Sequence, residues 1–283
     1  MTIDGFDPLS EHLHEGAPER GVIEEATQRV VLNILKSYTG YYDAFSEMIQ
    51  NALDALDEAQ RINPRFVPKL WIKIDIQKKQ LTVIDNGVGM SLEQFKLCFR
   101  PSVSFKKRRE YRGHKGVGAT FLAYGFSGVK LQTIRPELSI GGILRQGRDW
   151  AEDTGFSIER PKFEECAVAI PELSGAVSGT SIEIQIGGGQ RPQLAWLQAQ
   201  KASQWLDVLK AKTPLGGVYL AGDTDRRLKF ECNIQVIALD GSVDSATVKN
   251  PEYYYPHEIE ILHKVQDIDS IEKKLASCST TLC

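Results

Sequence analysis

Residues 46–56 read SEMIQNALDAL, and this stretch decides the fold because it joins an apolar and a polar stripe on one helix. Four apolar residues recur at helical spacing: Phe45, Ile49, Leu53 and Leu56. They predict an amphipathic helix over about residues 42–59. Glu47, Asn51 and Asp54 form a second stripe, set apart from the first. The helix therefore presents an acid and an amide together at one edge.

The polar stripe suggests a particular chemistry. A carboxylate such as Glu47, facing a bound polyphosphate, can orient and deprotonate a water molecule. An amide one turn away, such as Asn51, can supply an oxygen to a hard divalent cation. A solvated helix face is the simpler interpretation of these two residues taken alone, so the stretch leaves both interpretations open.

The elements around this helix indicate the fold class. An apolar helical pattern over residues 22–35 precedes it, and residues 70–76 then alternate between apolar and polar. A Lys-Lys turn follows, and residues 81–84 return as a partner strand. Two helices followed by a hairpin predict an α+β sandwich, with helices on one face of a sheet.

The rest of the chain supplies further elements. We expect an irregular arm over residues 1–20 and a polar, basic loop over residues 100–112. Other expected elements are helices at 91–99, 119–126, 193–212 and 259–275 and strands near 129–135, 140–145 and 181–186. The portion from residue 218 onward is short for a complete second domain, so the sequence leaves open that the chain is part of a longer protein.

Residues 85–90 read DNGVGM and follow a predicted buried strand. Asp85, held at a strand end, can accept a hydrogen bond from an exocyclic amine such as that of adenine. Gly87 and Gly89 allow the backbone to come close to a flat ring. A simple Asn-Gly turn that closes a strand explains the same residues without any ligand.

Residues 113–119 read GHKGVGA and precede the predicted apolar helix. Glycines free the backbone to wrap around anionic oxygens, and the start of the next helix points N–H groups at them. The segment lacks the Gly-Lys-Ser/Thr ending of a P-loop. No βαβ unit leads into it, as a dinucleotide fingerprint requires. Alone, such a turn is weak evidence for a phosphate site.

A fourth segment, Gly179-Thr180, opens a strongly alternating strand. A hydroxyl at a strand start can reach a nucleotide pocket. The β-propensity of threonine explains the same residue without a ligand.

Composition narrows the class of protein. The 283 residues are 42% hydrophobic and 25% charged, and the net charge of −3 gives no overall bias toward nucleic acid or membrane. Five scattered cysteines without C-x-x-C spacing disfavour a disulfide framework and fit a reducing compartment. No apolar run of signal-peptide or membrane-span length is present in the sequence. We therefore expect a soluble, cytoplasmic protein.

In order and separation, the four segments resemble the motifs of one ATPase superfamily, which joins gyrase, the heat-shock chaperone, histidine kinases and MutL (GHKL). Residues 46–56 are similar to its first box and residues 85–90 to its second. Residues 113–118, with the apolar helix after them, look like the third box, in the form seen in the heat-shock chaperone and microrchidia ATPases. Residues 179–180 are similar to the closing box. The resemblance covers about residues 22–190 and is nearest to the chaperone, MutL and microrchidia-type branches.

The resemblance implies a two-layer α/β sandwich with a mixed, mainly antiparallel sheet, the Bergerat ATP-binding fold, over residues 22–217. An N-terminal arm (1–21) would precede it. A small C-terminal extension, or the start of a following domain, would occupy residues 218–283. Residues near 98–115 would form a lid over the nucleotide. In this family a lysine or arginine from the following domain often completes the site, and this sequence does not place that residue.

The resemblance also implies ATP and Mg²⁺ as cofactors and assigns roles residue by residue. Glu47 would be the general base for the attacking water, and Asn51 the magnesium ligand. Asp85 would accept from the adenine amino group, with Thr180 nearby through water. The implied ATP-binding residues are Asn51, Asp54, Ala55, Asp85, Gly87, Gly89, Met90, Lys106, Gly113, His114, Lys115, Gly116, Val117, Gly118, Ala119 and Thr180.

The implied function is Mg-dependent ATP hydrolysis that drives lid closure and homodimerisation, as the motor or switch of a larger assembly. A binding module gated by ATP, with little hydrolysis, is the alternative. Phosphotransfer of the histidine-kinase type is less favoured, because those enzymes usually carry an asparagine or histidine at the position of Glu47. The candidate acceptors His12 and His14 also lie in the irregular arm.

A basic run at residues 106–112, KKRREYR, raises the question of nucleic-acid binding. Clustered cations attract phosphates. The run also overlaps the expected lid, and a solvated loop explains it equally well. Nucleic acid is therefore a possible partner, and further protein partners or domains of a longer chain are others.

Overall fold

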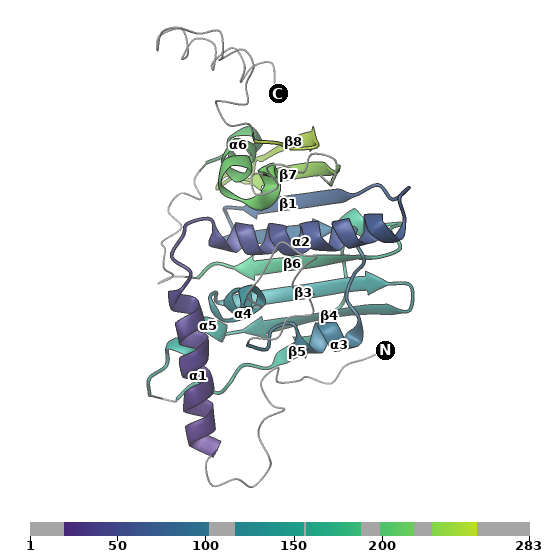
Figure 1. The fold of residues 1–283 in the computed structure, drawn as a ribbon. Coiled ribbons are helices and arrows are strands. Elements are labelled where there is room, and N and C mark those ends of the chain that lie inside the picture. The colour runs from purple at the N-terminus through teal and green to yellow at the C-terminus, as the bar shows by residue number, and fades with distance from the viewer. Residues whose placement is uncertain (1–19, 102–116, 156, 188–198, 218–227, 254–283) are drawn as a thin grey trace, which may run out of the picture.

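An eight-stranded sheet forms the centre of the protein, in the order β5-β4-β3-β6-β2-β1-β7-β8 (Figure 1). The structure is a computed structural model that describes residues 20–101, 117–155, 157–187, 199–217 and 228–253. The strands are β1 (Lys69–Asp75), β2 (Gln80–Asp85), β3 (Gly128–Arg135), β4 (Leu138–Arg145), β5 (Phe163–Glu165), β6 (Gly179–Gln185), β7 (Glu231–Ile237) and β8 (Val243–Lys249). Neighbouring strands are antiparallel except β1 and β7, which are parallel. The predicted mixed, mainly antiparallel sheet is confirmed.

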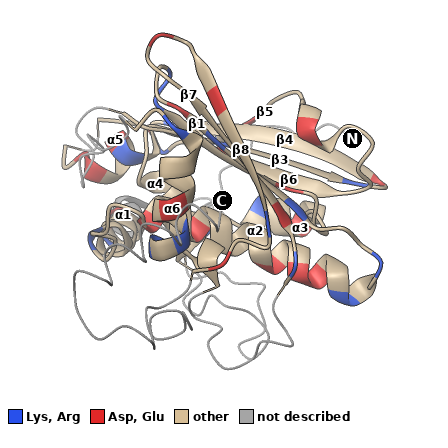
Figure 2. Cartoon of the chain, turned by 90° about the horizontal axis from the view of Figure 1, so that it is seen from above, with Lys and Arg blue, Asp and Glu red and all other residues tan. Residues whose placement is uncertain are grey.

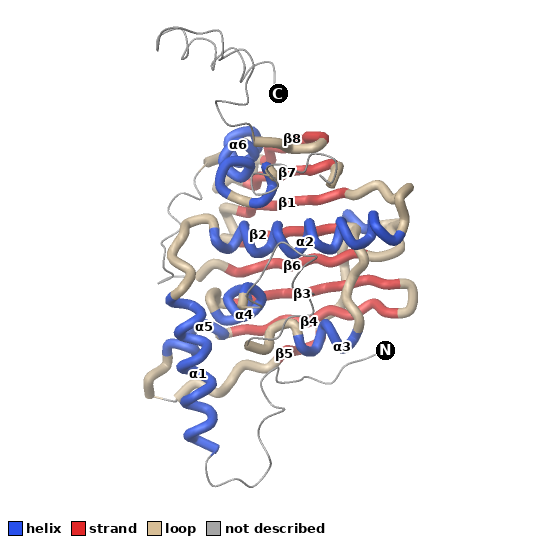
Figure 3. The backbone as a smooth tube through the Cα atoms, viewed as in Figure 1, coloured by secondary structure: helices blue, strands red, loops and turns tan. Residues whose placement is uncertain are grey.

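The longer helices form a second layer on one face of this sheet. The helices are α1 (Arg20–Lys36), α2 (Asp43–Ile62), α3 (Leu92–Leu97), α4 (Gly118–Tyr124), α5 (Gly147–Glu152) and α6 (Ala202–Lys212), and two short 3₁₀ turns are η2 (Pro171–Leu173) and η3 (Pro214–Gly216). Helix α2 lies across β2 and β6, and α4 lies across β3 (Figure 3). Seen from above, α2 and α6 occupy the same side of the sheet (Figure 2). The predicted two-layer α+β sandwich is confirmed.

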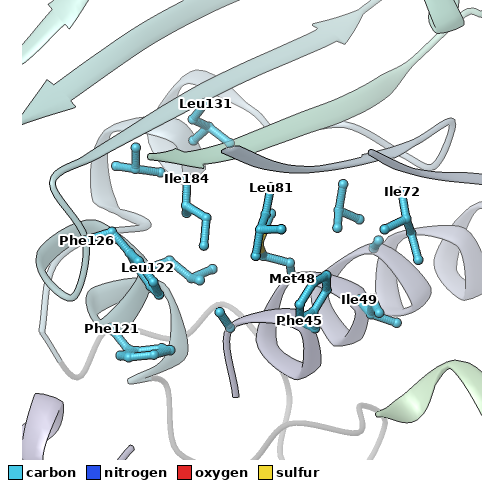
Figure 4. Packing of buried hydrophobic residues seen from close by; sticks show 14 of the residues in the cluster. Phe45, Met48, Ile49, Ile72, Leu81, Phe121, Leu122, Phe126, Leu131 and Ile184 are labelled. Atoms are coloured by element: carbon cyan, nitrogen blue, oxygen red, sulfur yellow. The ribbon is translucent and has the colours of Figure 1, made fainter. Parts of the chain in front are cut away.

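The apolar stripe of α2 attaches this helix to the sheet. Phe45, Met48 and Ile49 are fully buried and point toward Ile72 and Leu81 of the hairpin β1–β2 (Figure 4). Burying one side chain of this size stabilises a fold by about 1.5–3 kcal/mol. The stripe therefore fixes the rotation of α2 about its axis, and with it the direction in which the polar edge of the helix faces.

The opposite face of the sheet has a smaller apolar cover. Ile84, whose side chain points away from α2, packs with Ile170 and Leu173 in a second cluster. These two residues come from the segment around η2, which leads into β6. The cluster holds that segment beside the end of β2, and so sets where Gly179 and Thr180 begin their strand.

Helix α6 begins later than predicted. The pattern predicted a helix over residues 193–212, but residues 199–201 are not helical, and residues 193–198 lie outside the described part. The N–H of Ala202, the first helical residue, donates to Asp244 Oδ2 of β8 at 2.7 Å, and the Trp205 indole N–H donates to Ala199 O at 2.7 Å. A cap from a distant strand starts this helix, and local periodicity does not reveal such a cap.

The C-terminal hairpin belongs to the same sheet. Strand β7 pairs with β1, and β8 pairs with β7. Both strands come after residue 217, where we expected the nucleotide-binding domain to end. That domain boundary stays a prediction. The arm before residue 20 and the helix expected at residues 259–275 lie outside the described residues. In the described portions of the chain, no helix combines the length and hydropathy needed to cross a membrane.

Candidate functional site

Strand pairing brings two of the predicted motif segments together. Asp85, the last residue of β2, is the cross-strand partner of Thr180 in β6. Thr180 is in turn the partner of Thr133 in β3. All three side chains are less than 10% exposed. The aspartate of the second segment and the threonine of the closing segment therefore belong to one buried polar cluster within a largely apolar layer.

Asp85 is a buried hydrogen-bond acceptor. Its Oδ1 accepts the backbone N–H of Gly87 at 2.8 Å. Burial raises the pKa of Asp85 to about 7, against the lowering effect of that N–H. Among the described residues no donor reaches Oδ2 within hydrogen-bonding distance. The second oxygen is therefore suited to accept a hydrogen bond from an amine of a bound ligand.

Thr133, which belongs to none of the predicted motifs, connects the segments. Its Oγ1 accepts the Met90 N–H at 2.9 Å, donates to Gly179 O at 3.0 Å, and lies 3.4 Å from Thr180 Oγ1. One sequence signal could have identified Thr133. It follows Val129 and Leu131 at a spacing of two on the buried face of β3, and it is the polar residue of the three. Thr133 fixes Met90 and Thr180 relative to each other.

Both glycines of the second segment make close protein contacts. A Cβ on Gly87 would lie 2.6 Å from the carbonyl of Ala55, and Gly89 has a φ of +66° beside the Ile134 carbonyl. The Val88 N–H also donates to Ala55 O at 3.4 Å. These contacts explain the glycines in addition to the ring approach that the sequence suggested. Gly87 and Val88 dock the segment onto the C-terminal half of α2, and Gly89 docks it onto the end of β3.

Glu47 lies at the other end of the same helix edge. Its Oε1 accepts the hydroxyl of Tyr38 at 2.8 Å. Its Oε2 lies against Gly118, at the start of α4, in the space that a Cβ on that residue would fill. The first and third segments therefore meet at the Glu47 carboxylate. Tyr38, which the sequence analysis did not single out, is part of this contact.

The other polar residues of α2 separate into two environments. Asn51 lies one turn after Glu47 and is partly exposed. Asp54 is only 5% exposed and accepts the side-chain N–H of Gln50 at 3.0 Å. The prediction grouped Asp54 with the other two on one polar edge and among the ATP-binding residues; its burial argues against a solvated helix face at this position, and its role in binding stays a prediction. The inward packing of α2 covers the side on which Asp54 lies.

Part of the predicted site lies outside the described residues. This applies to Lys106, Gly113, His114, Lys115 and Gly116, to the basic run at 106–112 and to most of the expected lid. Val117, Gly118 and Ala119 are described, and they open α4. Before the gap, Phe99 is 2% exposed and packs on Phe163 of β5, with ring centroids 5.3 Å apart. The expected lid therefore starts from a residue anchored in the core.

The arrangement has two chemically different ends along α2. Ala55, which contacts Gly87, follows Glu47 by eight residues, a rise of about 12 Å along a helix. At one end, the Asp85 oxygen is available to an exocyclic amine. At the other, the Glu47 carboxylate faces the end of a glycine-rich segment. The described groups at both ends are hydrogen-bond acceptors: the first suits the amine of a ring, and the second can accept a proton beside the start of α4.

Comparison with known proteins shows which family part of the chain is similar to. Residues 37–141 match the family model described as "Histidine kinase-, DNA gyrase B-, and HSP90-like ATPase". This range contains Tyr38, Glu47, Asp85 and Gly118. Over these residues the chain is therefore similar to that ATPase family, and its sheet and helices are consistent with the Bergerat ATP-binding fold that the resemblance implied.

Individual relatives place the domain beside two branches. The chaperone protein HtpG of Campylobacter jejuni (strain 81-176) is 38% identical over 74 residues, which cover 23% of this chain and 12% of that protein. The DNA mismatch repair protein MutL of Kosmotoga olearia is 27% identical over 139 residues, 48% of this chain and 20% of that protein. MutL of Crocosphaera subtropica is 46% identical over 52 residues, 18% of this chain and 8% of that protein. The chain thus matches only a small part of each relative, and the similarity supports the predicted chaperone and MutL branches.

Proposed function

We propose that this chain binds Mg-ATP and hydrolyses it. The observation that supports the proposal is the position of the Glu47 carboxylate, held between the Tyr38 hydroxyl and Gly118. A general base must lie within reach of the water that it activates. Gly118 ends the glycine-rich segment that we expect to bind phosphates, so a water beside a terminal phosphate would lie near this carboxylate.

The proposed mechanism divides the work among the residues of the site. Asp85 accepts from the exocyclic amine of adenine through Oδ2 and so orients the base. The backbone at residues 117–119 binds the phosphates together with the glycine-rich segment before it. Glu47 takes the proton from the water as it attacks the terminal phosphate. Asn51 would hold Mg²⁺, which neutralises charge on the phosphate oxygens when bound.

Calorimetry and phosphate release test this proposal. We expect ATP to bind in the presence of Mg²⁺ and phosphate to be released slowly. Binding without release would favour the alternative, a module that ATP gates with little hydrolysis. No affinity for adenine nucleotides would contradict both.

Replacing Gly118 with alanine is expected to slow hydrolysis by about 100-fold, because the new Cβ would occupy the space of Glu47 Oε2 and displace the carboxylate. The Glu47 side chain can rotate away, so we expect the protein to stay folded. Phosphate release and thermal denaturation measure the two effects. The matched control is Gly155→Ala, an exposed site where a Cβ meets only ordinary contacts. Equal activity in Gly118→Ala and the control would contradict the placement of Glu47.

The proposal extends to the assembly. We infer that residues 22–217 form the nucleotide-binding domain, that a lid near residues 98–115 closes over ATP, and that closure lets two copies associate. The support is the family of the domain and the resemblance on which these expectations rest. Light scattering should give the mass of one chain without nucleotide and of two chains with a non-hydrolysable ATP analogue and Mg²⁺. A single-chain mass under both conditions, with binding verified by calorimetry, would contradict dimerisation alone.

A further inference from the structure

Tyr38 lies just after α1, and two contacts fix its ring, one at the hydroxyl and one on a ring face. The hydroxyl donates to Glu47 Oε1 at 2.8 Å. The ring stacks on Phe121 of α4, with centroids 4.0 Å apart and planes inclined by 6°. Phe121 packs in turn edge-on against Phe126 at 5.3 Å. Tyr38 therefore joins α2 to α4 at the point where Glu47 meets Gly118.

We propose that Tyr38 is a positioning residue for Glu47, an inference that rests on the function proposed above. By donating to Oε1, the phenol holds the carboxylate in one orientation, in which Oε2 faces Gly118. Oε2 is then the oxygen that receives the proton from water. The stack on Phe121 prevents the ring from following Glu47 away from α4. Nucleotide bound at the start of α4 and the base on α2 are thereby kept at a fixed separation.

The protonation chemistry of the pair agrees with this role. Burial, the Glu47 carboxylate and, more weakly, Asp43 raise the pKa of Tyr38 above its usual range, so the phenol keeps its proton and remains a donor at every working pH. A hydrogen bond donated to a carboxylate favours the ionised form of that carboxylate. The carboxylates of Glu47 and Asp43, both on α2, are the charges that disfavour an ionised phenol here. Tyr38 therefore helps Glu47 to remain ready to accept a proton.

The test is Tyr38→Phe, which removes the hydroxyl and keeps the stacked ring. We expect kcat to fall by a factor of about 10 to 100, as for the loss of a hydrogen bond to a charged group. KM for ATP should stay within about two-fold, because the hydrogen bond that is lost joins the phenol to Glu47, to which the proposal gives no part in binding ATP. The acid limb of the pH–rate profile should move to higher pH. Tyr41→Phe, at a ring that is 55% exposed, is the matched control and should behave as wild type.

Two further measurements separate positioning from a general structural effect. In a Glu47→Gln background, Tyr38→Phe should cause no further loss of residual hydrolysis; an equal loss there, or unchanged kcat and pH profile in the single variant, would overturn the proposal. The carboxyl titration of Glu47, followed by NMR with labelled glutamate, should shift to higher pH in Tyr38→Phe. This second readout needs no turnover. If wild type binds ATP without hydrolysing it, the proposed hydrolysis fails, and an unshifted titration would separately overturn the role of Tyr38.

Discussion

Replacing Glu47 with glutamine is expected to reduce kcat for ATP hydrolysis by a factor of about 10² to 10⁴, the range in which general bases contribute. Glutamine has nearly the same shape and keeps an oxygen that can accept the Tyr38 hydroxyl. It cannot accept a proton from water. Affinity for Mg-ATP should therefore change little, and single-turnover phosphate release together with calorimetry measures the two quantities separately.

A matched control for this variant is Glu93→Gln, an equally conservative change at an exposed position of α3. It should hydrolyse ATP as wild type does. Unchanged hydrolysis in Glu47→Gln would remove Glu47 from the mechanism. A joint loss of hydrolysis and affinity would instead show that the carboxylate acts in binding.

Replacing Asp85 with asparagine is expected to weaken ATP binding by a factor of about 10 to 100. The Gly87 N–H would still be accepted by the amide oxygen, which turns the NH₂ group toward the place of the adenine amine. Two donors would then face each other, and the hydrogen bond to a charged acceptor is lost. Calorimetry should also show a reduced preference for ATP over GTP, because guanine presents an acceptor oxygen where adenine presents its amine. Undiminished preference would contradict base recognition by Asp85.

The same variant should change how stability depends on pH. The pKa of Asp85 is about 7 in the folded protein against 3.8 for an ordinary aspartate, so the folded state holds a proton that the unfolded chain releases in this window. The contribution of this proton to the free energy of unfolding is therefore fully present below about pH 4 and is lost as pH rises toward 7. The free energy of unfolding falls by up to about 1.4 kcal/mol per pH unit in this window. The Asp85→Asn substitution removes this slope, because an amide does not titrate. Urea denaturation should show that the free energy of unfolding of the variant, relative to that of wild type, is higher at pH 8 than at pH 5. An equal difference at the two pH values would contradict the shifted pKa.

Periodicity predicted much of the fold because the main elements are amphipathic and long. The apolar stripe of α2 and the alternation of β1 are local patterns, and both elements lie within a few residues of the predicted bounds. Helix α5 and strand β5 were not predicted. Each has at most six residues, too few to show a period, and β5 depends on pairing with β4. Short elements of this kind are specified by their neighbours in space.

For the site, the sequence supplied the acids and glycines but not the residues that hold them. Glu47 and Asp85 were found because their motifs are compact in sequence. Thr133 and Tyr38 are single residues in other elements, and their roles follow only from the contacts with Met90 and Glu47. A polar residue on the buried face of a strand was the one available signal for Thr133. For Tyr38 no sequence signal was present.

The parallel pairing of β1 with β7 has a consequence for how the protein is made. Lys69 leaves the ribosome long before its partner Glu231. The backbone N–H and C=O groups on that side of β1 therefore have no β7 partner while more than half of the chain is synthesised. Such a non-local contact closes slowly, because a long loop must be ordered first. During this interval β1 is an open edge that another chain can pair with. Nascent chains of this protein therefore expose this edge until β7 emerges and pairs with it.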